Sequence, residues 1–328
     1  MMRKKRKKFY IVLVIFLLLI GSLGFSLFKP DHGVSSFVSI EGEQEFKEVY
    51  EEAMKGLPEP QNEKIISTSF GEVKVYTFLD SATANQAPLL ILPGKAASTP
   101  MWEPNLIDFM SHRPVYTIDL IGEPGLSTET VKIKDEYDQA TWLKEVIIAL
   151  EEPQIHLLGL SFGGWNATNV IIQEELPQVQ SLVLIDPIQV FGPIPLKMIA
   201  ASIPASIPII PQSIRERMLS YISGGAEVNE EEPVARLIET GMRTFKSKLP
   251  HPTQIRAEQL EEISVPVLAI LADNSTMHNA EKSYSLAKES LMHQKSSVVL
   301  FSNASHALNG EYPEKLAETI QDFILTLE

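Results

Sequence analysis

Residues 159–164 read Gly-Leu-Ser-Phe-Gly-Gly and place a serine in the setting that a nucleophilic serine needs. The apolar run 155–158 precedes them, and a helix-compatible run over 165–176 follows. A strand, a sharp turn and a helix in this order form a nucleophile elbow, where small residues let the strand and the helix approach closely. We therefore predict that Ser161 is a nucleophile and that the backbone N–H of Phe162 is one donor of an oxyanion hole.

A serine hydroxyl needs a general base to take its proton, and the base needs a partner that fixes its tautomer. The chain has seven histidines. His306 follows an expected strand over 297–301 and precedes the last helix, which places it at the carboxyl end of a strand, where α/β proteins build their sites. His156 lies inside the elbow strand and is expected in the core, and His278 has no clear setting. We expect His306 to be the base.

Strands and helices alternate from about Lys64 onward. Short continuous apolar strands separated by helices predict a mostly parallel sheet that is covered on both faces. The expected strands are 65–70, 73–79, 89–92, 115–118, 155–158, 182–185, 267–270 and 298–300, and the main helices are 102–110, 137–150, 165–176 and 313–327.

Residues 190–262 interrupt this alternation with apolar stretches that contain several prolines. The segment is too long for a loop of a compact domain, so we expect an inserted helical cap over the carboxyl edge of the sheet. Its apolar residues, among them Met198, Met218 and Met242, favour a small-molecule substrate with an acyl or otherwise apolar part.

Four groups of residues together resemble the α/β-hydrolase superfamily, of the esterase, haloperoxidase and peptidase kind, over about residues 65–328. They are Leu92-Pro93-Gly94-Lys95, the run 116–122 with Gly125 and Ser127, the elbow, and Ser305-His306-Ala307 ahead of a helix that begins Pro313-Glu314. The resemblance implies the α/β-hydrolase fold, a doubly wound sheet with a helical cap, and a serine hydrolase. The residues themselves show no metal-ligand constellation and no phosphate loop or dinucleotide fingerprint, so we expect no cofactor and no metal.

The resemblance also implies where the second oxyanion donor lies. In such enzymes it comes from a His-Gly-x motif after the third strand, and the matching residues here are Pro93, Gly94 and Lys95. The backbone N–H of Lys95 is then the donor. Proline removes the N–H of position 93 only, so the oxyanion hole can survive the exchange.

The acid departs from the common pattern of the superfamily. The usual acid position, after the strand that follows the cap, falls here on Ser275, and Asp273 lies two residues early. Some relatives, including certain haloalkane dehalogenases, carry the acid after the preceding strand, where this chain has Asp186 before Pro187. Both places lie at the same edge of the sheet. We favour Asp186 as the acid, with Asp273 as the alternative.

These residues predict a carboxylesterase that works through an acyl-enzyme on Ser161. One alternative is an aminopeptidase-like serine peptidase, which needs an acidic site for a substrate amine. Glu230-Glu231-Glu232, or Glu258, Glu261 and Glu262, could supply it. The other alternative is a non-catalytic binding or signalling homologue, for which the serine at the usual acid position is the best argument.

The N-terminus has the pattern of a signal anchor. A basic cluster over 3–8 precedes 20 uncharged residues, 9–28, which are long enough to span a bilayer as a transmembrane helix. The positive-inside rule then keeps the N-terminus in the cytoplasm and places the catalytic domain outside the cell membrane. A cleaved signal peptide and a secreted enzyme are the alternative. We expect a linker and a short helix over 29–60 and the hydrolase domain over 61–328.

Charge and cysteine content exclude several classes of function. The formal net charge is −14, and residues 31–328 alone carry 21 Lys/Arg and 42 Asp/Glu. Because a domain this acidic repels nucleic acid, we expect no nucleic-acid partner. The chain has no cysteine, which excludes disulfides and thiolate chemistry.

Overall fold

Residues 33–198 and 232–328 are described by the structure, a computed structural model. Residues Val34–Glu328 form one compact unit. The transmembrane segment predicted over 9–28 and a large part of the cap predicted over 190–262 lie outside the described residues. Among the helices in the described ranges, none is both long enough and apolar enough to cross a bilayer.

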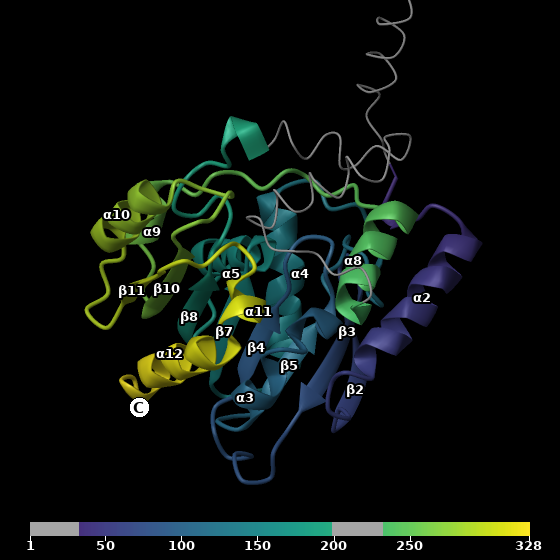
Figure 1. Ribbon diagram of the computed structural model, residues 1–328, viewed down its shortest axis with the longest axis horizontal. Helices are drawn as coiled ribbons and strands as arrows, with labels where there is room; N and C mark the ends of the chain where they lie inside the picture. Colours follow the sequence, from purple (N-terminus) through teal and green to yellow (C-terminus); the bar gives the residue numbers. More distant parts are fainter. Residues whose placement is uncertain (1–32, 199–231) are drawn as a thin grey trace, which may run out of the picture. The chain divides into compact units, whose positions relative to one another are not determined.

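In the described residues nine strands form one mixed sheet, most of which is labelled in Figure 1, and two more form a small separate ladder. The strands are β1 (Ser36–Phe37), β2 (Asn62–Thr68), β3 (Gly71–Phe78), β4 (Leu89–Leu92), β5 (Val115–Ile118), β6 (Thr128–Glu129), β7 (Ile155–Leu160), β8 (Val179–Ile185), β9 (Phe245–Lys246), β10 (Val267–Ala272) and β11 (Ser297–Phe301). The main sheet has the order β11-β10-β8-β7-β4-β5-β3-β2, and β6 pairs with β3. The neighbouring strands of the series β5-β4-β7-β8-β10-β11 are all parallel to one another. Strand β3 is antiparallel to its neighbours β2, β5 and β6.

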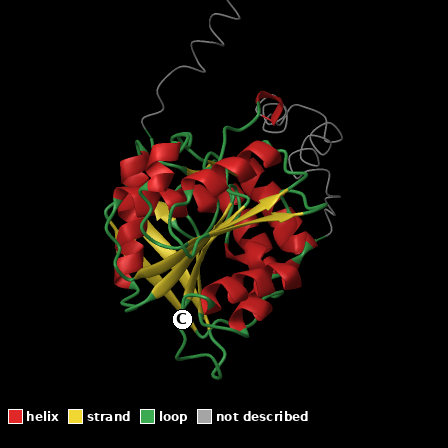
Figure 2. Ribbon diagram, turned by 90° about the vertical axis from the view of Figure 1, so that its left-hand side faces the viewer, coloured by secondary structure: helices red, strands yellow, loops and turns green. Residues whose placement is uncertain are grey.

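The described helices cover both faces of this sheet, as Figure 2 shows. They are α2 (Ile40–Met54), a 3₁₀ turn η1 (Thr99–Trp102), α3 (Leu106–Met110), α4 (Glu136–Ala149), α5 (Phe162–Gln173), α8 (Pro233–Thr244), α9 (Ala257–Glu261), α10 (Ala280–Ser290), α11 (Leu308–Glu311) and α12 (Pro313–Leu325). One apolar cluster joins α4, α5, α9 and α10 to one face. A second cluster joins α2, η1, α3, α8 and α12 to the other face.

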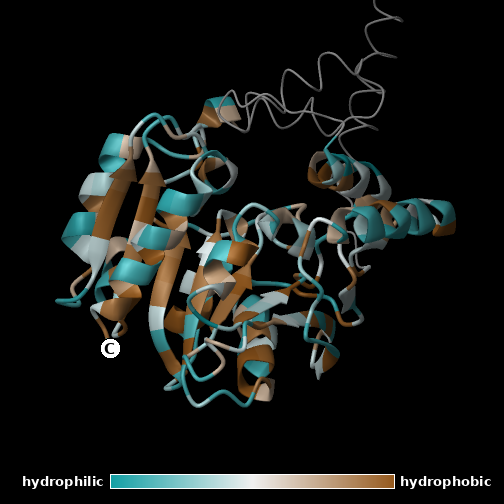
Figure 3. Cartoon of the chain, turned by 60° about the horizontal axis from the view of Figure 1, so that its bottom comes forward, coloured by the Kyte–Doolittle hydropathy of each residue, from teal (hydrophilic) through white to brown (hydrophobic). Residues whose placement is uncertain are grey.

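Sandwiching the sheet between helices buries its central strands on both faces. All residues of β4, β7 and β10 are buried, and Figure 3 shows the strands of the sheet as mostly hydrophobic. Parallel strands covered by helices read as continuous apolar runs, which is why the sequence predicts them well.

His156 in β7 is 3% exposed, as expected for the core, and its Nδ1 lies 2.8 Å from Ser181 Oγ. Burial and the charge of Arg113 lower the pKa of His156 to about 4.

The segment 29–60 was expected to be a linker and a short helix, and its described part holds a short strand and a helix that begins earlier than expected, both packed on the hydrolase domain. β1 pairs antiparallel with β9, and α2 is a 15-residue helix that begins at an Ser39 N-cap. Phe46 and Tyr50 on α2 are each 1% exposed, and Tyr50 Oη donates to Asp119 Oδ2 over 3.0 Å. The reason is hydrophobic burial: the apolar stripe of α2 covers sheet surface that would otherwise face water.

Candidate active site

The turn between β7 and α5 has the geometry of a nucleophile elbow. Ser161 adopts φ 55° and ψ −115°, a conformation that a non-glycine residue rarely takes. A Cβ on Gly159 would lie 2.3 Å from the carbonyl oxygen of Gly163, and one on Gly163 would lie 2.3 Å from that of Leu92. Both glycines are therefore required by close backbone contacts, and the turn presents Ser161 at the carboxyl end of β7.

Ser161, His306 and Asp186 form one hydrogen-bonded chain. His306 Nε2 lies 2.9 Å from Ser161 Oγ, and His306 Nδ1 lies 2.6 Å from Asp186 Oδ2. A carboxylate only accepts hydrogen bonds, so Nδ1 carries the hydrogen and Nε2 is left to accept from the serine hydroxyl. This is the arrangement that removes a proton from a serine during nucleophilic attack.

Asp186 follows β8 and is completely buried. Its φ of 41° lies in the left-handed region, which Asp tolerates better than most residues. Burial by itself raises the pKa of this carboxyl. Hydrogen bonds from His278 and His306 outweigh that effect, so the pKa of Asp186 lies well below its usual value. The group is therefore a carboxylate at neutral pH and can stabilise an imidazolium.

Asp273, the alternative acid, follows the neighbouring strand β10 but makes no hydrogen bond to His306 in the described part of the chain. Its backbone N–H donates to the carbonyl of Phe301 over 3.2 Å, and its Oδ1 is buried without a described partner. Ser275, at the usual acid position, instead donates its hydroxyl to Asp186 Oδ2 over 2.6 Å. The geometry thus favours Asp186, and its catalytic role stays a prediction.

The expected oxyanion donors lie on two segments that meet at Ser161. Phe162 is the first residue of α5, so its N–H has no partner within the helix. A Cβ on Gly94 would lie 3.6 Å from Ser161 Cβ, which places the loop that carries Lys95 beside the nucleophile. The roles of Phe162 and Lys95 as donors remain predictions.

A buried carboxylate holds the loop that carries Lys95. Glu123 is 1% exposed and accepts from the backbone N–H of Ala96 over 2.8 Å. It also accepts from Lys95 Nζ over 3.2 Å and from Ser247 Oγ over 3.1 Å. Ala96 has a positive φ of 57°, so the loop turns sharply at the residue that Glu123 holds. The Lys95 side chain, 56% exposed, is thereby paired with a residue of its own chain.

Comparison with known proteins identifies the family of this chain. The profile described as "Alpha/beta hydrolase family" matches residues 89–319. The chain belongs to this family. Carboxylesterase YbfK of Bacillus subtilis (strain 168) is 24% identical over 299 residues, which cover 88% of this chain and 96% of YbfK. The uncharacterized carboxylesterase nap of the same strain is 26% identical over 293 residues, covering 85% of this chain and 91% of nap.

A solved structure extends the likeness to three dimensions. The crystal structure of naproxen esterase (carboxylesterase NP) from Bacillus subtilis superposes with a TM-score of 0.78 at 22% sequence identity. The match covers 88% of this chain and 100% of that one. The α/β-hydrolase fold predicted from the sequence is confirmed.

The sequence analysis assigned no role to His278, which the structure places beside Asp186. Its Nε2 lies 2.6 Å from Asp186 Oδ1, and its side chain is 2% exposed. It stands three residues after Ser275, in the loop where the superfamily usually carries its acid. The sequence signal that could have identified His278 is its place in this loop together with a candidate acid, Asp186, behind the neighbouring strand.

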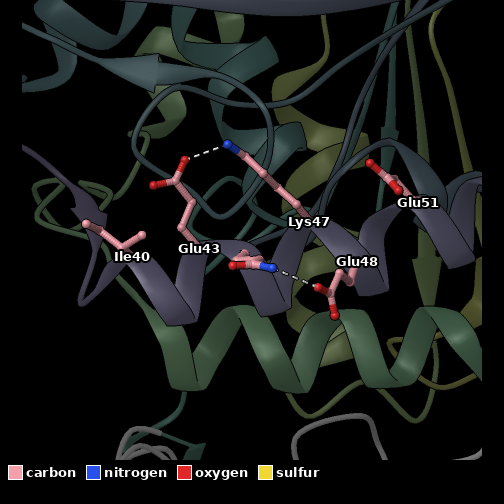
Figure 4. A pocket seen from close by; sticks show the side chains of 6 residues that line it. Ile40, Glu43, Lys47, Glu48 and Glu51 are labelled. Atoms are coloured by element: carbon pink, nitrogen blue, oxygen red, sulfur yellow. Dashed lines mark hydrogen bonds and ion pairs between the residues drawn. The ribbon is translucent and has the colours of Figure 1, made fainter.

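A hollow on the surface of the hydrolase lies along α2 (Figure 4). Its lining residues are Ile40, Glu43, Gln44, Lys47, Glu48 and Glu51. They pair along the helix itself, with Lys47 bonded to Glu43 and Gln44 bonded to Glu48. None of them is a nucleophile or belongs to the network of Ser161. In the described ranges, no three His, Asp or Glu residues are grouped in a way that could hold a metal ion.

Proposed function

We propose that this hydrolase is a serine carboxylesterase that cleaves its substrate through an acyl-enzyme on Ser161. The observation that carries the proposal is the hydrogen-bonded chain from Ser161 Oγ, at the N-cap of α5, through His306 to Asp186 behind β8. Two curated relatives that match over most of their length are carboxylesterases, and this chain too is a hydrolase that acts on ester bonds.

The arrangement assigns one step to each group. Ser161 Oγ attacks the ester carbonyl carbon while its proton passes to His306 Nε2. The N–H groups of Phe162 and Lys95 stabilise the oxyanion of the tetrahedral intermediate, and the carboxylate of Asp186 stabilises the imidazolium. His306 then gives its proton to the leaving alkoxide. Water, deprotonated by His306, then attacks the acyl carbonyl carbon, and His306 returns this proton to Ser161 Oγ as the bond between Oγ and the acyl carbon breaks and the acid is released.

The substrate that we propose is a small ester with an apolar or acyl part. Met198, at the edge of the described part of the cap segment, is 6% exposed, and Met242 on α8 is 39% exposed. Met218, the third methionine of this prediction, lies outside the described residues. An alkoxide leaves more easily than an amine, so an ester is the expected bond.

A fluorophosphonate probe tests the nucleophile, because it reacts covalently with an activated serine. We expect stoichiometric labelling of the wild type and none of Ser161→Ala, read by mass spectrometry of the intact protein. Turnover of p-nitrophenyl esters should exceed that of aminoacyl-arylamides. Preference for arylamides would indicate the peptidase, and an unlabelled wild type would indicate a non-catalytic homologue.

We also propose that residues 9–28 anchor this esterase in the cell membrane, with the N-terminus in the cytoplasm and the catalytic domain outside. The basic cluster over 3–8 and the uncharged run behind it support this orientation. We expect the full chain in the membrane fraction after a carbonate wash, and a variant lacking residues 1–30 in the soluble fraction. Recovery of a shortened wild-type chain from the culture medium would indicate a cleaved signal peptide.

A further inference from the structure

Asp186 is shared by two histidines, one on each carboxylate oxygen. His306 Nδ1 lies 2.6 Å from Oδ2, and His278 Nε2 lies 2.6 Å from Oδ1. The His306 side chain is 12% exposed and reaches Ser161, whereas the His278 side chain is 2% exposed and reaches no other described residue by hydrogen bond. Asp186 is thus the described partner that His278 hydrogen-bonds.

The acceptor character of Asp186 defines the tautomer of His278. Since a carboxylate cannot donate, Nε2 carries the hydrogen, and in the neutral ring Nδ1 is a bare acceptor. This Nδ1 is buried and has no hydrogen-bond partner among the described residues. Burying an unsatisfied polar atom is costly, and an apolar side chain would avoid that cost. The donated bond to Asp186 is therefore the contribution that distinguishes His278 from an apolar residue in this place.

Two further donors complete the surroundings of the carboxylate. The backbone N–H of Ala272 donates to Oδ1 over 3.0 Å, and Ser275 Oγ donates to Oδ2 over 2.6 Å. Ala272, Ser275 and His278 all come from the end of β10 and the loop behind it, where the superfamily pattern places its acid. The segment that would have carried the acid thus supplies three donors that hold the acid of the neighbouring strand.

Each of these donors withdraws electron density from the carboxylate. They hold the plane of the carboxylate so that Oδ2 faces His306. They also stabilise part of its negative charge, which weakens the attraction between the carboxylate and protonated His306. We propose that His278 is a positioning residue of the hydrolytic site: its Nε2–H orients the Asp186 carboxylate and sets how strongly Asp186 supports a protonated His306. This inference rests on the proposed function.

Removing a donor should therefore make Asp186 a stronger partner for protonated His306. The His306 ring then keeps its proton, and stays unable to accept one from Ser161, up to a higher pH. In His278→Leu we expect the acid limb of the kcat/KM profile to move to higher pH by roughly 0.5 to 1 unit. A residue that only fills space would lower stability or kcat without moving this limb.

Two other variants make the test specific. His278→Gln places an amide N–H near the position of Nε2, so it should return the acid limb to the wild-type pH. Ser275→Ala removes the donor to the other oxygen by deleting a single side-chain oxygen, and it should move the limb in the same direction as His278→Leu. If the leucine variant does not fold, the comparison of Ser275→Ala with wild type carries the test.

Other ionisable groups near the network are the same in all variants. Asp273 lies on the same loop, and Glu311 on α11 accepts from Ser305 N and Oγ over 2.8 and 2.6 Å. In the described chain neither hydrogen-bonds Asp186, His278 or His306. A shift common to His278→Leu and Ser275→Ala therefore reports on Asp186.

The profiles are measured on the full chain with a p-nitrophenyl ester between pH 4 and 9, with the folded state checked by thermal unfolding. An upward shift in His278→Leu and Ser275→Ala that His278→Gln reverses supports the inference. If the acid limb of the folded variants stays at the wild-type pH or moves to lower pH, the inference about His278 is overturned, while Ser161-dependent hydrolysis still supports the proposed function. A wild type without Ser161-dependent hydrolysis removes the proposed function itself and this inference with it.

Discussion

Asp186→Asn is expected to lower kcat by about 10⁴-fold with little effect on KM for a small ester, as measured by steady-state hydrolysis. The expected loss follows from the tautomer of His306. Asp186 accepts at both oxygens, whereas an asparagine offers one oxygen and one NH₂ group. Where the NH₂ group faces Nδ1, His306 must carry its hydrogen on Nε2, and this ring cannot accept the proton of Ser161.

The substitution changes little else, because asparagine tolerates the left-handed backbone that Asp186 adopts at φ 41°. The remaining donors can also adapt. The Ser275 hydroxyl can rotate to accept from the NH₂ group, and the oxygen that remains in place of Oδ1 still accepts from Ala272 N–H and from His278 Nε2. A loss of activity with a retained unfolding transition would therefore assign the effect to the imidazole and the charge that supports it.

Asp273→Asn is the matched control, because it makes the same chemical change at the end of the neighbouring strand. Since Asp273 does not hydrogen-bond His306 in the described residues, we expect its kcat to stay within a few fold of wild type. If Asp186→Asn kept its turnover while Asp273→Asn lost it, Asp273 would be the acid, and the rings of this site would have to rearrange during the reaction.

Gly163→Ala should lower the free energy of unfolding by about 3 kcal/mol or more, because the added methyl group meets backbone and not a movable side chain. Its Cβ would lie 2.3 Å from the carbonyl oxygen of Leu92 and 2.5 Å from that of Pro93. Relief requires β4 and α5 to separate. That movement displaces the loop behind Pro93 from Ser161 and so weakens the oxyanion hole as well. Urea unfolding and ester turnover measure the two effects.

Gly310→Ala provides the control within the same chain. Gly310 lies in the short helix α11, and a Cβ added there meets no atom within 4 Å. Alanine favours helix over glycine by up to about 1 kcal/mol, so the variant should be neutral or slightly more stable. Equal destabilisation by both substitutions would show that the close contact at the elbow is not the cause.

The central strands could be predicted from the sequence because burial on both faces leaves an unmistakable local pattern. β4 and β5 have the predicted bounds, and the runs that became β7, β8 and β10 differ only by added residues at their ends. The pairing of β1, near the start of the described residues, could not be predicted from such a pattern. β1 has two residues, and its partner β9 lies about 200 residues further along the chain. Local pattern carries no information about such a pairing.

The sequence by itself predicted the elbow, the candidate base and the family, since the patterns behind them lie in short stretches: Gly159 and Gly163 around Ser161, and His306 behind a strand. Only the tertiary structure favours Asp186 over Asp273 as the acid, because both follow parallel strands and reach the same edge of the sheet. It also brought His278 to Asp186 from a loop 92 residues away. The reason is geometric: a carboxylate offers its lone pairs in a few directions, and only the folded positions of β8 and β10 determine which donors meet them.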